Sequence, residues 1–103
     1  MNITKIIALE EVATDLDNGE QFYDSQEPGT GTYFRDSIVA DIESFQPYAG
    51  IHAKHHGLYR MLSVRFPYAV YYTLKADVAV VVAVLDMRRN PASIRGKLNS
   101  RKS

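Results

Sequence analysis

The chain has 103 residues, of which 46% are hydrophobic and none is cysteine. This length fits one domain, and this hydrophobic content is enough for a packed core. The lack of cysteine excludes disulfides, thiolate zinc sites and cysteine nucleophiles. No apolar run reaches the roughly 20 residues of a membrane span, and the N-terminal residues do not resemble a signal peptide, so we expect a cytoplasmic protein.

The net charge is zero, but the charges are unevenly distributed along the chain. Residues 1–50 carry two basic and ten acidic side chains, a net charge of −8. Residues 51–103 carry ten basic and two acidic side chains, a net charge of +8. Such a division is typical of a protein with one basic surface that faces a partner, and equally of solvated helix faces followed by a basic tail.

The N-terminal segment predicts a strand followed by a helix. Residues 5–9 form the predicted edge strand, and apolar residues at helical spacing from Leu9 to Tyr23 predict an amphipathic helix of about five turns. Gly19 falls inside this helix. A glycine there indicates either a local weakness, because glycine is a poor helix former, or close packing against another element.

A second helix is predicted over residues 32–45. The segment Pro28 to Gly31 separates it from the first helix, because proline and two glycines do not continue a helix. Phe34, Ile38 and Ile42 form its apolar stripe. Because the connection between the two helices is short, we expect them to form an antiparallel hairpin.

In the second half of the chain the apolar period changes to two, which predicts antiparallel strands over residues 58–64, 66–74 and 78–87. The last strand is nearly continuous in Val, Ala and Leu, so we expect it in the interior of the sheet, covered on both faces. The remaining segments are expected to form an irregular loop, a short basic helix and a flexible basic tail, over residues 47–57, 92–98 and 99–103.

These elements predict one α+β domain over residues 1–98, in the order β-α-α-β-β-β. The N-terminal strand should lie beside an antiparallel sheet, and the helical hairpin should pack on one face of that sheet. The predicted core consists of apolar residues on the inner faces of the helices and the last strand: Leu16, Phe34, Ile38, Ile42, Val80, Val82 and Val84.

Five local motifs follow one another in this order of elements: Phe22-Tyr23, Pro28 to Gly31 with Phe34, residues 57–60, residues 65–72 and residues 86–91. Together they resemble the RelE/ParE superfamily, the toxins of type II toxin–antitoxin pairs, over residues 9–91. The Phe-Pro-Tyr strand and the late Arg-Arg-X-Pro are more similar to the ParE branch than to the RelE branch. Thr30 stands where the family commonly has leucine.

The ParE resemblance implies a bacterial, non-enzymatic toxin that inhibits DNA gyrase, serves plasmid stabilisation and is neutralised by a cognate antitoxin. It implies no cofactor and no metal, and contact with operator DNA only through the antitoxin. The expected target- or antitoxin-binding residues lie in the basic half: Arg60, Arg65, Tyr68, Arg88 and Arg89. Each also has a structural interpretation, since Tyr68 can pack in the sheet and both late arginines can pair with Asp86 or with acids of the first helix.

The alternative from the RelE branch is a ribosome-dependent mRNA endoribonuclease, whose partners would be the ribosome and mRNA. Cleavage through the ribose 2′-OH needs a base and an acid, but residues 44–76 contain no Asp or Glu. Tyr68 stands where RelE-branch proteins have an arginine, and Asn90-Pro91 where several have catalytic residues. Lys54 with a nearby histidine could substitute. A third alternative is an inactive family member that is still bound by an antitoxin.

The histidines at positions 52, 55 and 56 have the i, i+3, i+4 spacing that can hold a transition metal on a helical turn. No carboxylate is near them in sequence, and glycines bound the loop. We therefore expect His52, His55 and His56 to be solvent-exposed loop residues. No phosphate-binding loop, dinucleotide fingerprint, nucleophile elbow or zinc motif is present in the sequence.

Overall fold

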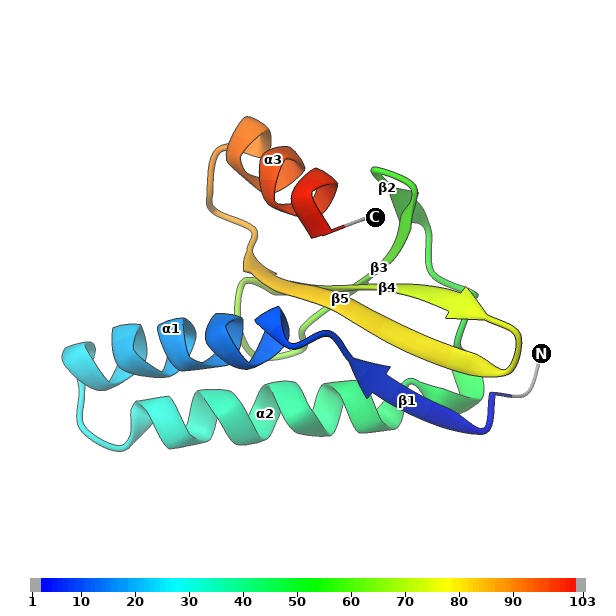
Figure 1. Ribbon diagram of the computed structural model, residues 1–103. Coiled ribbons are helices and arrows are strands. Elements are labelled where there is room, and N and C mark those ends of the chain that lie inside the picture. The colour runs from blue at the N-terminus through cyan, green and yellow to red at the C-terminus, as the bar shows by residue number, and fades with distance from the viewer. Residues whose placement is uncertain (1–2, 102–103) are drawn as a thin grey trace.

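A five-stranded sheet separates a pair of helices on one face from a third helix on the other face (Figure 1). The computed structural model describes residues 3–101. The strand order is β1-β5-β4-β3-β2. In chain order the elements are β1 (Lys5–Ala8), α1 (Glu11–Gln26), α2 (Thr30–Ser44), the 3-10 helix η1 (Gln46–Tyr48), β2 (Lys54–His55), β3 (Leu58–Leu62), β4 (Tyr68–Lys75), β5 (Val78–Asp86) and α3 (Pro91–Arg101).

The predicted α+β class and the order β-α-α-β-β-β are confirmed, with two additions. The segment 47–57, which was expected to be irregular, contains the short strand β2 and most of the 3-10 helix η1. The sheet is also mixed, because β1 pairs in parallel with β5, from Lys5 opposite Val78 to Ala8 opposite Val81. A parallel pair requires a long connection, because the chain must come back to the end where the first strand began. All the elements from α1 to β4 lie between β1 and β5 and provide this connection.

The predicted strands 58–64 and 66–74 are interrupted by a loop at residues 63–67. The buried carboxylate of Asp41 on α2 holds this loop, since its Oδ2 accepts hydrogen bonds from Ser63 Oγ at 2.9 Å and from the Val64 N–H at 3.3 Å. Pro67 lies in the loop rather than in β4, which suits a residue that has no N–H to contribute to a strand ladder.

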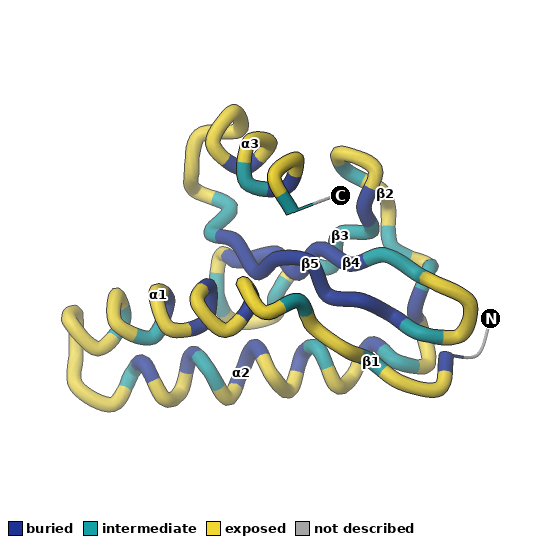
Figure 2. Tube along the Cα trace, viewed as in Figure 1, coloured by how far each residue is buried: buried dark blue, intermediate teal, exposed yellow. Residues whose placement is uncertain are grey.

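The first part of the core lies between the sheet and the helical hairpin, where the facing strand and helix positions are dark in Figure 2. Phe34 of α2 is its centre. The Phe34 ring lies 4.7 Å from the ring of Tyr68 on β4 and 5.2 Å from the ring of Tyr23 on α1. Among the predicted core residues only Ile42 is partly buried, and the other six are buried.

The second part of the core lies between the sheet and α3. Ile94 and Leu98, one helical turn apart, pack on Tyr71, Ala83 and other apolar residues of β4 and β5. A β-bulge lies opposite Tyr71 and Tyr72, where the register passes from Ala83 to Val81. The extra residue, Val82, consequently packs in the same cluster as Ala83.

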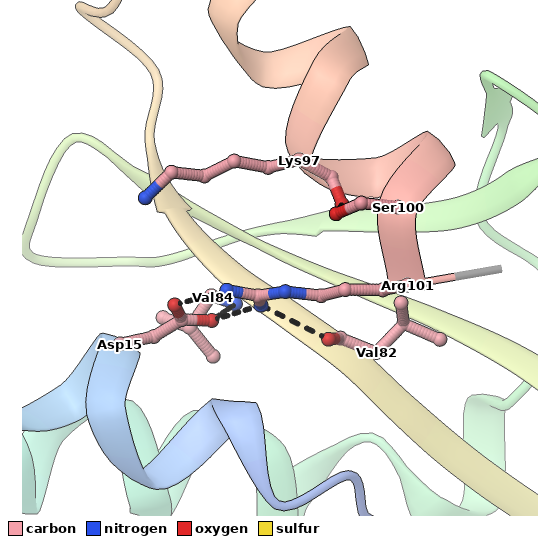
Figure 3. Close-up of polar contacts among 6 residues, drawn as sticks. All are labelled: Asp15, Val82, Val84, Lys97, Ser100 and Arg101. Atoms are coloured by element: carbon pink, nitrogen blue, oxygen red, sulfur yellow. Dashed lines mark hydrogen bonds and ion pairs between the residues drawn. The ribbon is translucent and has the colours of Figure 1, made fainter.

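Helix α3 is longer than the predicted helix 92–98 and continues to Arg101. The guanidinium of Arg101 donates to both carboxylate oxygens of Asp15 on α1, at 2.6 and 2.8 Å, and to the carbonyl oxygen of Val82 at 3.2 Å (Figure 3). The Asp15 carboxylate also accepts the N–H of Val84 at 2.9 Å. The sequence predicted a flexible tail over 99–103, because terminal residues commonly fray. Residues 99–101 are helical, and 102–103 lie outside the described residues.

Gly19 is a point of close packing between α1 and α2. A Cβ atom at this position would lie 2.5 Å from Cζ of Phe34, an aromatic side chain enclosed by the core. We expect Gly19→Ala to destabilise the fold by about 1–3 kcal/mol, because overpacking outweighs the better helix propensity of alanine. Gly96→Ala in α3 is the matched control, since a Cβ there meets nothing within 4 Å. Urea denaturation should show the control unchanged or slightly stabilised, and equal effects of both substitutions would contradict this packing.

Arg101 neutralises a carboxylate that is almost fully enclosed, since the side chains of Arg101 and Asp15 are 10% and 3% exposed. We expect Arg101→Leu to lower the free energy of unfolding by roughly 3–5 kcal/mol, because it leaves a buried charge unpaired. The control is Arg95→Leu, at an exposed position of the same helix, which should change stability by less than about 0.5 kcal/mol. Similar denaturation midpoints for the two variants would show that the ion pair does not anchor α3.

Candidate partner-binding site

Three of the five predicted binding residues come together where β5 ends. Tyr68 is the first residue of β4 and lies opposite Asp86, the last residue of β5. Arg88 and Arg89 follow in the turn that leads to α3. The antiparallel pairing of β4 with β5 therefore brings the tyrosine and both arginines to one end of the sheet, where both guanidinium charges act on the Tyr68 phenol.

Arg88 is held by Asp86. Its Nε donates to Oδ1 at 3.0 Å, a terminal nitrogen donates to Oδ2 at 2.9 Å, and its backbone N–H donates to Oδ1 at 2.9 Å. These bonds lower the pKa of the Asp86 carboxyl. The guanidinium carbon also lies 5.7 Å from the ring centroid of Phe22. Of the two interpretations that the sequence left open for Arg88, pairing with Asp86 is therefore the one that the structure shows.

Tyr68 belongs to the core as well as to this site. The residue is only 7% exposed, and burial raises the pKa of its phenol to about 12. The phenol therefore stays protonated near neutral pH and cannot act as a general base there. Packing within the sheet, the structural interpretation of this tyrosine, is what the structure shows.

A cleft of about 200 Å³ lies beside these residues, between α1, the end of β5 and α3. The side chains that line it include two aromatic residues, two carboxylates and two cations: Phe22, Tyr68, Asp15, Asp86, Arg89 and Lys97. Lys97 was not among the residues predicted to bind a partner. Its spacing of four residues from Arg101 places both on one face of α3, which is the signal that could have indicated it.

Arg60 and Arg65 lie away from this cleft. Arg60 is on β3 opposite Tyr71, within hydrogen-bonding reach of its phenol, on the sheet face that carries α3. Arg65 is exposed in the loop between β3 and β4. The five residues predicted as one contact set therefore occupy three places on the molecule.

Lys54 and His55, which the sequence offered as substitutes for a missing catalytic acid and base, lie on opposite faces of the sheet. The Lys54 ammonium is 4.9 Å from the ring centroid of Tyr59, whereas His55, the next residue of β2, faces the opposite side of the sheet. The charge of Arg60 adds to the effect of burial in lowering the pKa of His55. No group of three His, Cys, Asp or Glu side chains within residues 3–101 is placed to hold a metal ion.

His52 and His55 are partly buried, and His55 lies in β2, so the expectation of exposed loop histidines was wrong for these two residues. The hydroxyl of Tyr72 accepts the N–H of Gly50 at 2.9 Å and lies 2.5 Å from Nδ1 of His52. The hydroxyl can donate its proton to Nδ1 when the His52 ring is neutral and carries its proton on Nε2. The Tyr72 side chain, fully enclosed between strands and α2, thereby anchors the loop that precedes β2.

This hydrogen bond predicts a pH-dependent stability. Burial lowers the pKa of folded His52 below its ordinary value of 6.5, so the folded state favours the neutral ring. The stability that this residue contributes is complete above 6.5 and is lost as the pH falls through the lower folded pKa. Urea denaturation of the wild type and His52→Gln from pH 8 to pH 5 should show a smaller acid loss in the variant. Parallel pH profiles would contradict the assignment.

Comparison with known proteins identifies the fold but finds no relative in sequence. No protein family model matches the chain, and no curated protein sequence matches it. A chain of the chromosomal ParDE toxin–antitoxin system from P. aeruginosa has a similar structure, with a TM-score of 0.74 and 15% sequence identity. The similarity covers 84% of this chain and 98% of that chain. The RelE/ParE-like fold that the sequence motifs predict is thereby confirmed.

Proposed function

We propose that the chain is the toxin of a type II toxin–antitoxin system, a ParE-like inhibitor of DNA gyrase that acts in the cytoplasm until a cognate antitoxin neutralises it. The observation that carries this proposal is the extent of the structural similarity, which covers 98% of the ParDE chain. The motifs at residues 65–72 and 86–91, which resemble the ParE branch, support the same choice. No described helix has the length and apolar character of a membrane-spanning segment.

The chemistry of the cleft between α1, the end of β5 and α3 supports a binding function over ribonuclease activity. Cleavage through a 2′-OH needs a group that accepts a proton near neutral pH. The two carboxylates of the cleft, Asp15 and Asp86, are each held by an arginine, and the phenol of Tyr68 has a pKa of about 12. Arginine itself stabilises negative charge but does not act as a base, because its pKa exceeds about 12.

The charge distribution supports an acidic partner. The basic side chains of residues 51–103 give that half a net charge of +8, and an acidic antitoxin segment would associate with it faster at low ionic strength. In this proposal Arg60, Arg65 and Arg89 serve contacts with the antitoxin or the target, and Arg88 joins them through the part of its side chain that stays exposed while it pairs with Asp86. Operator DNA is contacted only through the antitoxin.

The proposal predicts that the purified protein inhibits DNA supercoiling by gyrase and leaves mRNA on translating ribosomes intact. Addition of the product of a neighbouring small gene, if that gene encodes the antitoxin, should restore supercoiling. The measurements are a gel assay of plasmid supercoiling and primer extension on mRNA from a translation reaction.

Ribosome-dependent cleavage of mRNA would overturn the proposal in favour of the ribonuclease. In that case the cleavage should be lost in His55→Ala, which lies beside Arg60, and retained in Lys97→Gln. If the protein binds the antitoxin but neither inhibits gyrase nor cleaves mRNA, it is an inactive member that is only bound by the antitoxin.

A further inference from the structure

The cleft between α1 and α3 contains two cationic side chains that form no ion pair, although the charge of one of them, Arg89, acts on Asp86. Each carboxylate that lines it is already neutralised, since Asp15 pairs with Arg101 at 2.6 Å and Asp86 with Arg88 at 2.9 Å. The side chains of the remaining two charged residues, Arg89 and Lys97, make no hydrogen bond or ion pair with any other residue of the described range 3–101. The cleft therefore has a local charge of about +2 and favours an anionic group.

The same cleft follows an open edge of the sheet. Strand β1 pairs with β5 only as far as Val81, so no strand of the described chain lies beside the last residues of β5 on this side. Asp15 and Arg101 cover the next backbone groups, the N–H of Val84 and the carbonyl of Val82. The edge beyond Val84 adjoins the cleft, and an extended chain can lie along such an edge.

An apolar side chain completes the lining. Phe22 on α1 is 44% exposed, although it lies in the cleft beside Tyr68 and Leu85. The guanidinium of Arg88 covers one part of its ring, 5.7 Å from the centroid. A ligand with a carboxylate and an adjacent apolar side chain would match both the cations and the aromatic surface.

We propose that this cleft binds an extended, acidic segment of a partner protein, with a carboxylate between Arg89 and Lys97 and an apolar side chain on Phe22. Only the identification of that partner as the antitoxin rests on the proposed function. Protein fits better than nucleic acid, because the two unpaired cations of the cleft would balance only two of the several charges of a phosphate chain. A cleft of about 200 Å³ also admits side chains rather than stacked bases.

The direct test is an NMR titration of the full-length chain with a short blocked peptide of alternating glutamate and leucine. The backbone signals of Phe22, Val84, Leu85, Asp86 and Arg89 should shift. Lys97→Gln should weaken binding by about three- to tenfold, as expected for the loss of one partly exposed ion pair. The control Arg95→Gln, at an exposed position of α3, should bind as the wild type does.

Two further probes test whether the cleft requires an acidic ligand and whether it prefers protein to RNA. A peptide with glutamine in place of glutamate should bind more weakly than the acidic peptide, and single-stranded RNA of similar length should not displace the acidic peptide. Equal binding of both peptides, displacement by RNA, shifts confined to another face or no binding at millimolar concentration would each overturn the proposed site.

The same variants separate this inference from the proposed function. If the acidic peptide binds in the cleft but the chain does not inhibit gyrase, the site stands and the proposed function fails. If the chain inhibits gyrase and the antitoxin neutralises Lys97→Gln as well as it neutralises the wild type, identification of the partner segment as part of the antitoxin is wrong.

Discussion

The ion pair between Asp15 and Arg101 joins three elements that are distant in the sequence. Its carboxylate lies on α1, its guanidinium lies on α3, and both bind backbone groups of β5, the N–H of Val84 and the carbonyl of Val82. These groups lie just beyond the point where pairing with β1 ends, and no strand within residues 3–101 covers them. A buried polar group without a hydrogen-bond partner costs about 1–3 kcal/mol. The stability of β5 therefore depends on this pair, which supplies partners for the N–H of Val84 and the carbonyl of Val82.

The same pair shapes the cleft. It ties α3 to α1 at one end of the open edge, and the Arg88–Asp86 pair occupies the other end. Each arginine neutralises a carboxylate that would otherwise repel an acidic partner. What remains for recognition is the charge of Arg89 and Lys97 together with one exposed aromatic ring. The ion pairs that form within the folded chain therefore determine which cations are available in the cleft. The total number of basic residues does not determine this.

Much of the fold was predictable because its signals are local. The change from a helical period to a period of two located the hairpin and the sheet, and the apolar run of residues 78–87 identified a strand that is covered on both faces. The misses arose from tertiary contacts. Asp41 ends β3 early by binding residues 63 and 64, and the parallel pairing of β1 depends on the path of the whole chain. Neither the period nor the propensity of a segment contains that information.

The sequence by itself determined the main helices and strands, the burial of the valine-rich strand and the concentration of positive charge in the second half. It could not determine which charges stay free, because pairing depends on distances between residues such as Asp15 and Arg101, 86 positions apart. The tertiary structure alone separated Arg60 and Arg65 from the end of β5, placed Tyr68 in the core and exposed Lys97 to the cleft. An ion pair lowers the electrostatic free energy only over a few ångströms, so only folding could select the charges left for a partner.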